Sequence, residues 1–485
     1  MVGEGCQPGE RHRGNMLVGM SDAPSERSAT EADSAAGSMA GSMAGSLDRF
    51  RRLVRIPTVS RIDEAQTDWG QFDAFIAALP ELYPATHAAL EREIVGGHSM
   101  LYRWAGREDG PPTVLMAHYD VVPATDEGWT RPPFSAEVVD DGDGDVIWGR
   151  GTLDDKGALV SILEAVETRA AAGFRPRNDV YLSFGHNEET TGAGAIAIVE
   201  TLEARGVRPA LVLDEGGAVV EGVFPGVSKP AAVIGVSEKG ITTVALTVDQ
   251  QGGHASTPPR LTATARLARA IVRLNARPFP ARFSPTNVEM LRTVGAHATG
   301  PMRWALGNLW LTGPLMLRVF TRLSDETRAM VRTTQAVTQL SGSQAANALA
   351  ERAEAMVNVR IAVGSSVEET ERHIRSAIAD PAVRVEALLP SEPSPVSPTT
   401  GAAWELLSRS VRQTFGEDEV IVTPYVMLGA SDSRHFTRIS DHVYRFSPFE
   451  MSGEERGTLH AMNERIRVES WLRGVRFYTT LVGEL

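Results

Sequence analysis

The stretch "LSFGHNEETTGAGA", from Leu182 to Ala195, places two adjacent carboxylates, Glu188 and Glu189, shortly after an apolar run. The run from Val180 to Phe184 has the length and composition of a buried strand. Neighbouring like charges repel, and burying them costs free energy unless a cation compensates them. The stretch therefore predicts a buried strand whose end carries acidic groups that need a cation.

The fold predicted around this stretch is an α/β layered one. Two further apolar runs, Thr113 to Ala117 and Ala210 to Leu213, are typical of buried strands in a sheet that is covered on both faces. Apolar residues at helical spacing lie between the runs: Leu159, Ile162, Leu163 and Val166 before Gly173, and Ala195, Ile198, Val199 and Leu202 before Gly206. Strands that alternate with helices indicate an α/β layered fold.

The pattern changes after Gly240, which predicts an inserted domain. Alternating segments at 241–250, 354–363 and 383–388 are typical of a more exposed sheet, with helices expected at 261–276 and 367–378. The Pro/Ser-rich stretch 388–401 is predicted to be a linker. We expect a disordered tail at 1–46, a catalytic metal-binding domain at 47–238 and 395–485, and an inserted α+β lid domain at 239–394.

Composition limits the classes of function. The 485 residues suggest two or three domains, and the net charge of −13 argues against nucleic acid as a partner. The single cysteine, Cys6, lies in the predicted tail, so neither an internal disulfide nor a Cys-ligated metal site is expected. The N-terminus lacks the apolar region of a secretory signal, and we expect a cytoplasmic location.

One apolar segment, "WALGNLWLTGPLMLRVF" from Trp304 to Phe320, is interrupted by glycine, asparagine and proline. No run reaches the roughly 18 apolar residues of a membrane span, so none is expected. We favour a buried helix pair for this segment; a membrane-facing or partner-facing surface is the alternative.

Acidic and histidine residues follow the predicted strands in a regular way. His118 and Asp120 follow the first, Glu188 and Glu189 the second, and Asp214 and Glu215 the third, while Asp154 and Asp155 begin a helix. Ligands in open α/β sheets gather at the carboxyl ends of strands. Histidine with carboxylates and no cysteine is a donor set for zinc, with cobalt or manganese as alternatives. The donors outnumber those that one tetrahedral ion needs, which favours two ions sharing a carboxylate.

Six motifs occur in an order that resembles a known family. They are "HYD", "GRGTLDDKG", "GHNEE", "LDEGG", "GGHAS" and "LHAMNE". The order is similar to that of the M20 metallopeptidases, the aminoacylase and carboxypeptidase group, and "LDEGG", "VSEKG" and "SDSRHF" resemble the carboxypeptidase S-like branch, which includes N-acyl amino acid hydrolases. The resemblance runs from Leu47 to the C-terminus. It implies a zinc-peptidase-like catalytic domain with an inserted lid of the dimerisation type, through which two chains can pair.

The resemblance also implies roles for single residues. The metal ligands would be His118, Asp154 as the bridge, Glu189, Asp214 and His460. Asp120 would hold the imidazole of His118, Glu188 would be the general base, and the Asp154–Asp155 peptide bond is expected to be cis. Glu215 competes with Asp214 as a ligand, and we favour Asp214 because it directly follows the strand.

Four residues are implied to face the substrate. His254 would bind the carbonyl oxygen in the transition state, Asn347 and Arg360 would line the site from the lid, and Arg434 would grip a substrate carboxylate. The predicted activity is cleavage of a dipeptide, a short peptide or an N-acyl amino acid next to a free carboxylate. A dinuclear hydrolase of another bond, such as a phosphoester, and a catalytically silent binding protein on the same scaffold are the alternatives.

Overall fold

The structure is a computed structural model, and it describes residues 43–142, 144–224 and 226–485. The predictions for the tail before residue 43, Cys6 included, lie outside the described residues. The chain divides into two units, Met1–Ser46 and Leu47–Leu485, and the second contains the fold. Among the described residues, no helix combines the length and apolar character that crossing a membrane requires.

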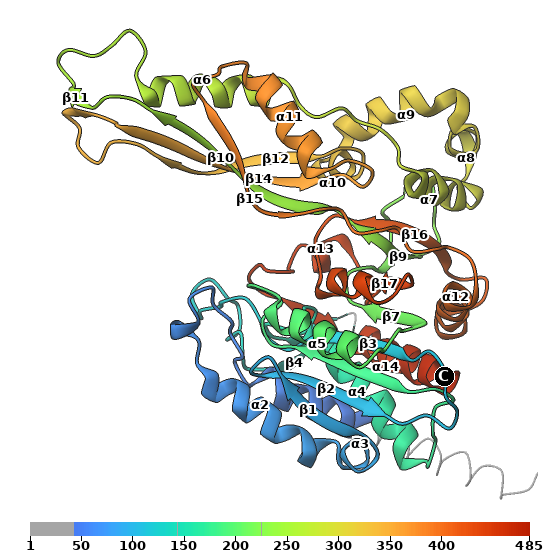
Figure 1. Ribbon diagram of the computed structural model, residues 1–485. Coiled ribbons are helices and arrows are strands. Elements are labelled where there is room, and N and C mark those ends of the chain that lie inside the picture. Colours follow the sequence, from blue (N-terminus) through green and yellow to red (C-terminus); the bar gives the residue numbers. More distant parts are fainter. Residues whose placement is uncertain (1–42, 143, 225) are drawn as a thin grey trace, which may run out of the picture. The chain divides into compact units, whose positions relative to one another are not determined.

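A ten-stranded mixed sheet lies at the centre of this unit (Figure 1). Its strands, in spatial order, are β1 (Glu91–Val95), β2 (Ser99–Trp104), β6 (Val180–Gly185), β3 (Thr113–His118), β7 (Leu211–Asp214), β17 (Val443–Arg445), β9 (Ala231–Glu238), β8 (Ala218–Val220) and β18 (Glu450–Met451), and β16 (Ile421–Met427) pairs with β9. β3 lies between β6 and β7 and runs parallel to both. These three strands confirm the predicted apolar strands to within one residue at each end.

Helices pack on both faces of the sheet. The helices around it are α2 (Trp69–Leu82), α3 (Pro84–Ala89), α4 (Lys156–Ala171), α5 (Ala193–Ala204), α12 (Ala402–Phe415), α13 (Gly453–Arg456) and α14 (Val468–Gly483), with 3-10 turns η1 (Glu64–Gln66) and η2 (Asp432–Arg438). Side chains alternate along β3, so Leu115 joins the core under α4 and α14, whereas Val114 joins a second core under α5 and η2. This three-layer arrangement confirms the predicted α/β fold.

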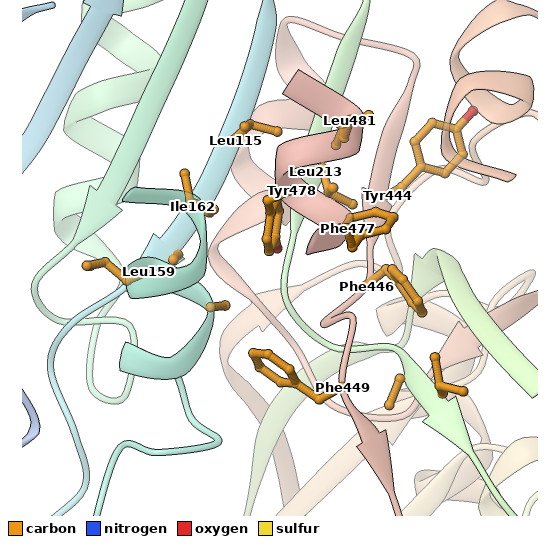
Figure 2. Packing of buried hydrophobic residues seen from close by; sticks show 14 of the residues in the cluster. Leu115, Leu159, Ile162, Leu213, Tyr444, Phe446, Phe449, Phe477, Tyr478 and Leu481 are labelled. Carbon is orange, nitrogen blue, oxygen red and sulfur yellow. The ribbon is translucent and has the colours of Figure 1, made fainter. Parts of the chain in front are cut away.

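The larger core joins segments that are far apart in the sequence. Figure 2 shows Leu159 and Ile162 of α4 near Leu115 of β3, with Phe477 and Tyr478 of α14 close by. The core side chains of both helices are almost completely buried, and each large side chain buried in this way contributes about 1.5–3 kcal/mol to folding. The C-terminal helix therefore completes the core that begins with the first strands.

A small three-stranded sheet complements the ten-stranded one. β4 (Glu137–Asp140), β5 (Asp145–Trp148) and β19 (Arg465–Arg467) form an antiparallel sheet in the order β19-β5-β4. The Arg465–Arg467 strand directly precedes α14. The sheet thus links the hairpin before Asp154 to the segment that follows His460.

The region of the predicted lid contains a four-stranded antiparallel sheet. Its order is β12 (Thr334–Ser341), β14 (Arg352–Ile361), β10 (Gly240–Asp249) and β15 (Arg384–Ser391), and α6 (Ala263–Ala276) and α11 (Val367–Ile378) share a separate core with it. β11 (Gly253–His254) and β13 (Ala348–Leu349) form a separate two-stranded sheet. In the chain, β11 follows β10 and β13 precedes β14. These elements confirm the predicted α+β pattern, while the exact domain limits stay a prediction.

The predicted linker begins too early. Residues 388–391 belong to β15, where Leu388 pairs with Thr243 of β10. Pro390 is tolerated because β15 is an edge strand, so the missing N–H costs no hydrogen bond to a further strand. Pairing with β10 therefore overrides the local composition.

Four helices follow α6 in the chain: α7 (Pro285–Ala296), α8 (Gly300–Gly307), α9 (Leu309–Leu323) and α10 (Asp325–Met330). The apolar segment from Trp304 to Phe320 forms parts of α8 and α9, so the predicted helix pair is confirmed. The prediction that this pair is buried is only partly right, because Trp304 is 59% and Trp310 is 78% exposed. Leu309 and Met316 lie on the opposite, buried side.

Candidate metal centre

The parallel strands bring their acidic and histidine residues to one edge of the sheet. His118 is the last residue of β3, Glu188 and Glu189 follow β6, and Glu215 follows β7. Because the three strands run in the same direction, their carboxyl ends lie side by side. The sequence puts an acid or a histidine at the end of each strand, and the parallel pairing of the strands brings these side chains together.

One group of possible ligands consists of His118, Asp154 and Glu215, whose donor atoms lie within 4.8 Å of one another. The Nε2 atom of His118 is 2.9 Å from Oδ1 of Asp154 and 3.5 Å from Oε1 of Glu215. All three side chains are buried or nearly so.

A second group consists of Asp154, Glu189 and His460, again within 4.8 Å. The Nε2 atom of His460 is 3.0 Å from Oδ2 of Asp154 and 3.0 Å from Oε2 of Glu189. Asp154 thus presents one oxygen to each group, which is the geometry of a carboxylate that bridges two ions. His460 has a φ of 57° and belongs to the segment between α13 and β19.

The electrostatics of the two groups fit a cation. Burial raises the pKa of Glu215 to about 7, and the nearby charge of Asp154 adds to the rise. The carboxylates of Asp154 and Glu189 raise the pKa of His460 to about 10, because they stabilise a positive charge on its imidazole. The buried Oε1 atom of Glu189 has no hydrogen-bond partner among the described residues. Two imidazoles and three carboxylates without a thiolate suit a pair of divalent ions.

Asp120 orients both the first imidazole and the acidic loop. Its backbone carbonyl lies 3.0 Å from Nδ1 of His118, which leaves Nε2 free to face the other ligands. Its carboxylate accepts hydrogen bonds from the backbone N–H groups of Glu188 and Glu189, at 3.1 and 3.2 Å, and from the Ser60 hydroxyl. One buried carboxylate therefore fixes a ligand and the adjacent loop together.

Glu188 and Glu189 lie in different environments. Burial raises the pKa of Glu188 well above its usual range, and the acids Glu215, Asp432 and Asp154 raise it further against the opposing effect of His118. Glu189 instead pairs with His460. Glu189 therefore belongs to a possible ligand group, whereas Glu188 belongs to neither group.

The preference for Asp214 over Glu215 is not supported by the geometry. Oδ2 of Asp214 accepts the backbone N–H of Ser433 at 2.9 Å, and Asp214 is in neither ligand group. Glu215 reaches His118 instead. Side chains of successive residues in an extended segment point to opposite sides, so only one of the two acids can face the other ligands.

The segment that carries Asp154 is held by a residue to which the sequence analysis gave no role. The carboxylate of Glu464 accepts the N–H groups of Gly151, Leu153 and Asp154 at 3.0, 2.8 and 3.2 Å, and pairs with Arg150 at 2.5 Å. Glu464 ends the "LHAMNE" motif, which was the available signal. The Asp154–Asp155 peptide bond is cis, as the resemblance implies.

A second unassigned acid, Asp432, lies beside the end of β6. Burial raises its pKa well above the usual range, and Asp214 adds to the rise. A Cβ atom at Gly185 or Gly192 would come within 2.7 or 2.8 Å of its oxygens, so the carboxylate occupies space that only glycine leaves open. Its position in "SDSRHF" was the only signal in the sequence.

The four residues predicted to face the substrate are not in the two ligand groups. His254 is exposed in β11, where its ring bonds the Ser256 hydroxyl, and the carbonyl of Asn347 accepts the N–H of Ala255 on the paired segment. These two residues are therefore neighbours within the lid.

Arg360 and Arg434 lie near one buried acid. The Nε atom of Arg434 is 3.2 Å from Oε1 of Glu238, at the end of β9. Burial lowers the pKa of Arg360, and the charge of Arg434 lowers it further, against the opposing effect of Glu238. The other oxygen of Glu238 pairs with the buried Arg445 at 3.1 Å, so two guanidinium groups contact this carboxylate and that of Arg360 lies close enough to feel its charge.

The layered α/β fold and these two groups define a protein with a candidate centre for divalent metals. Residues 114–484 match the family model described as Peptidase family M20/M25/M40. The chain belongs to this family and is an M20 metallohydrolase of the carboxypeptidase and N-acyl amino acid hydrolase group.

Individual relatives agree with this assignment. The chain is 37% identical over 443 residues to the N-fatty-acyl-amino acid synthase/hydrolase PM20D1 of Xenopus tropicalis, covering 90% of this chain and 85% of that protein. It is 29% identical to carboxypeptidase S of Saccharomyces cerevisiae, covering 89% and 82%.

Solved structures share the fold. The M20 family metallo-carboxypeptidase Sso-CP2 from Sulfolobus solfataricus matches with a TM-score of 0.65 at 17% identity, covering 90% of this chain and 98% of that one. Bacillus subtilis YXEP, a dinuclear metal binding peptidase from the M20 family, matches with a TM-score of 0.56 at 13% identity, covering 91% of this chain and 98% of that one.

Proposed function

We propose that this protein is a two-metal amidohydrolase that cleaves a peptide or N-acyl amide bond next to a free carboxylate and releases an amino acid. The observation that carries the proposal is the shared Asp154, whose two oxygens face two separate ligand groups beside the partly buried Glu188. The relatives, a carboxypeptidase and an N-fatty-acyl-amino acid synthase/hydrolase, support this substrate class.

The five ligands in this proposal are His118, Asp154, Glu189, Glu215 and His460. His118 and Glu215 would hold one ion, Glu189 and His460 the other, and Asp154 would bridge them. Zinc is the ion we expect, with cobalt and manganese as alternatives. Two such ions supply Lewis acidity that activates a water molecule and polarises a carbonyl.

Glu188 is the general base in this proposal. Its buried carboxylate takes a proton from the attacking water and gives it to the nitrogen of the leaving amine. A raised pKa makes the second transfer easier, because the protonated acid is then stable long enough to donate. Asp120 keeps Glu188 in place through the backbone N–H of that residue.

Residues of the lid and of η2 would supply the remaining contacts. Arg434 and Arg360 would bind the free carboxylate of the substrate, with Glu238 holding Arg434 in position. His254 would bind the carbonyl oxygen after a movement of the lid or from a second chain paired through it.

The decisive variant is Glu188→Ala. Loss of the general base should lower kcat by about 10³-fold, while the protein keeps both metal ions. Metal content by mass spectrometry and turnover of dipeptides and N-acyl amino acids, with zinc, cobalt and manganese supplied separately, are the measurements. The exposed Glu200→Ala on α5 is the matched control and should retain activity.

Three results would contradict the proposal. Metal loss in Glu188→Ala would mean that Glu188 is itself a ligand. Turnover of phosphoesters but not amides would favour a hydrolase of another bond. Metal-loaded protein without turnover on the whole panel would favour a silent binding protein.

A further inference from the structure

A large apolar cavity is lined in part by residues that neighbour the proposed metal ligands in the chain. Its volume is about 460 Å³, which falls in the range of ligand pockets and far exceeds the voids of a packed interior. Its walls come from the segment after β7, from β8 and β9, and from α7 to α10. With about 30 Å³ for each water-sized group, it has room for on the order of fifteen such groups.

The walls suit an aliphatic chain. Met302, Met316 and Met330 lie in the lining, and their flexible thioethers adapt to chains of different shape. Two of the charged groups in the lining, Glu326 and Arg456, lie 3.2 Å apart and compensate each other. Glu221 is the other charged residue in the lining, so the wall is mainly apolar.

The cavity adjoins the metal centre at two places in the chain. Gly216 lines it and directly follows the proposed ligand Glu215. Arg456 lines it and lies four residues before His460. Two short chain segments thus connect the cavity wall to two of the proposed ligands.

The free carboxylate of the substrate would bind at a different position, near Glu238 and Arg434. Val233 lines the cavity, and Glu238, which holds Arg434, lies five residues further along the same strand, β9. At about 3.3 Å per residue, the two positions are about 16 Å apart. The free carboxylate and the acyl group of one substrate can thus occupy different sites.

The cavity is also open at α9. Val319 and Leu323 line it and are 41% and 60% exposed, so a chain can enter between the exposed apolar side chains of this helix. Exposed apolar residues at the mouth of an apolar cavity mark a site for an apolar ligand.

We propose that this cavity binds the acyl chain of the substrate, and that the protein prefers N-acyl amino acids with a long aliphatic chain over short acyl groups and dipeptides. The inference rests on the proposed function for the amide bond that is cleaved, but it assigns the cavity independently. Each methylene that moves from water into the cavity is worth up to about a fourfold gain in affinity or in kcat/KM.

The first test compares acetyl-, octanoyl- and palmitoyl-leucine as substrates of the full chain loaded with zinc. We expect kcat/KM to rise by at least about tenfold from acetyl to octanoyl, because six further methylenes reach the cavity. Equal kcat/KM values for the three substrates would overturn the inference and leave the proposed amidohydrolase activity standing.

The second test narrows the cavity with Val319→Trp, a change at a partly exposed wall residue of α9. The ratio of kcat/KM for palmitoyl-leucine to that for acetyl-leucine should fall by about tenfold. Val272→Trp is the matched control, since Val272 is 67% exposed on α6 and is not in the cavity lining; it should keep the ratio of the unchanged protein. The same ratio in both variants would contradict the assignment.

A binding measurement separates the cavity from the reaction. Palmitate should bind to the unchanged protein in isothermal titration calorimetry, with an affinity about tenfold weaker in Val319→Trp than in Val272→Trp. If no amide is hydrolysed but this difference is found, the proposed function fails and the cavity assignment stands. Absence of palmitate binding, or equal binding by both variants, would overturn the assignment.

Discussion

Two pairs of adjacent acids show how the environment of single residues decides their role. Glu189 pairs with His460 in a ligand group, whereas its neighbour Glu188 is outside both groups. Glu215 likewise faces His118, while Asp214 is held by the N–H of Ser433. In each pair, the side chain that faces the other ligands is the second acid, so the first is free for another task.

The second pair gives a direct test of the ligand set. The Glu215→Ala protein should bind about one metal ion fewer per chain than the unchanged protein, because the substitution removes a carboxylate from one ligand group. Asp214→Asn should keep both, because the amide oxygen can still accept the hydrogen bond from Ser433. Metal equivalents per chain after dialysis are the measurement. Metal loss in Asp214→Asn with retention in Glu215→Ala would reverse the assignment.

The sequence could predict that acids gather at these strand ends, but not which member of a pair is a ligand. Strand positions followed from apolar runs such as Val180 to Phe184, and parallel pairing then brought their ends together. The choice between Asp214 and Glu215 depends on the direction of the backbone where β7 ends, which has no signature in residue type. Glu464 was overlooked for a similar reason, since its partners are backbone N–H groups about 310 positions earlier.

At the scale of elements, Glu464 ties the segment before β19 to the segment that carries Asp154. Glu464→Ala would leave Arg150 buried, at 3% exposure, without its carboxylate partner. We expect a loss of about 3–5 kcal/mol in the free energy of unfolding and a metal affinity about 10–100-fold weaker. Urea unfolding and metal titration are the measurements.

A second glutamate provides the control for this variant. Glu454 pairs with Arg465 at 2.6 Å but is 80% exposed, so Glu454→Ala should change the free energy of unfolding by less than about 1 kcal/mol. Equal effects of the two substitutions would show that the hydrogen bonds of Glu464 do not organise the site.

Elements differ in how far local sequence determines them. β10 and β14 followed from alternation, because one face of their sheet is buried against α6 and α11. β15 was shortened in the prediction because the stretch from residue 388 is rich in Pro and Ser, and the edge position of the strand explains why Pro390 is tolerated there. The exposure of Trp310 was not predictable from composition, since apolar residues usually indicate a buried helix and the cavity below α9 forms only in the folded chain.

The whole molecule gathers its charges around the candidate centre from both ends of the chain. His118 and His460 are separated by more than 300 positions, and the C-terminal segment must fold onto the first strands to bring them to Asp154. Assembly of the centre is therefore coupled to closure of the main core, in which α14 packs against α4. A ligand that binds there stabilises the complete fold and not one local segment.

Removing the metal should consequently lower the stability of the whole protein. Without a cation, Glu188, Glu189 and Glu215 are buried near one another, and burial raises the pKa of each carboxyl because their charges are costly. Free zinc at about a hundredfold excess over its Kd should add about 2.7 kcal/mol for one site, or a rise of several degrees in Tm. Thermal unfolding of chelator-treated and zinc-loaded protein measures the difference, with magnesium at equal ionic strength as the control. The rise should be smaller in Glu215→Ala, and an identical Tm with and without zinc would remove the basis for a metal centre.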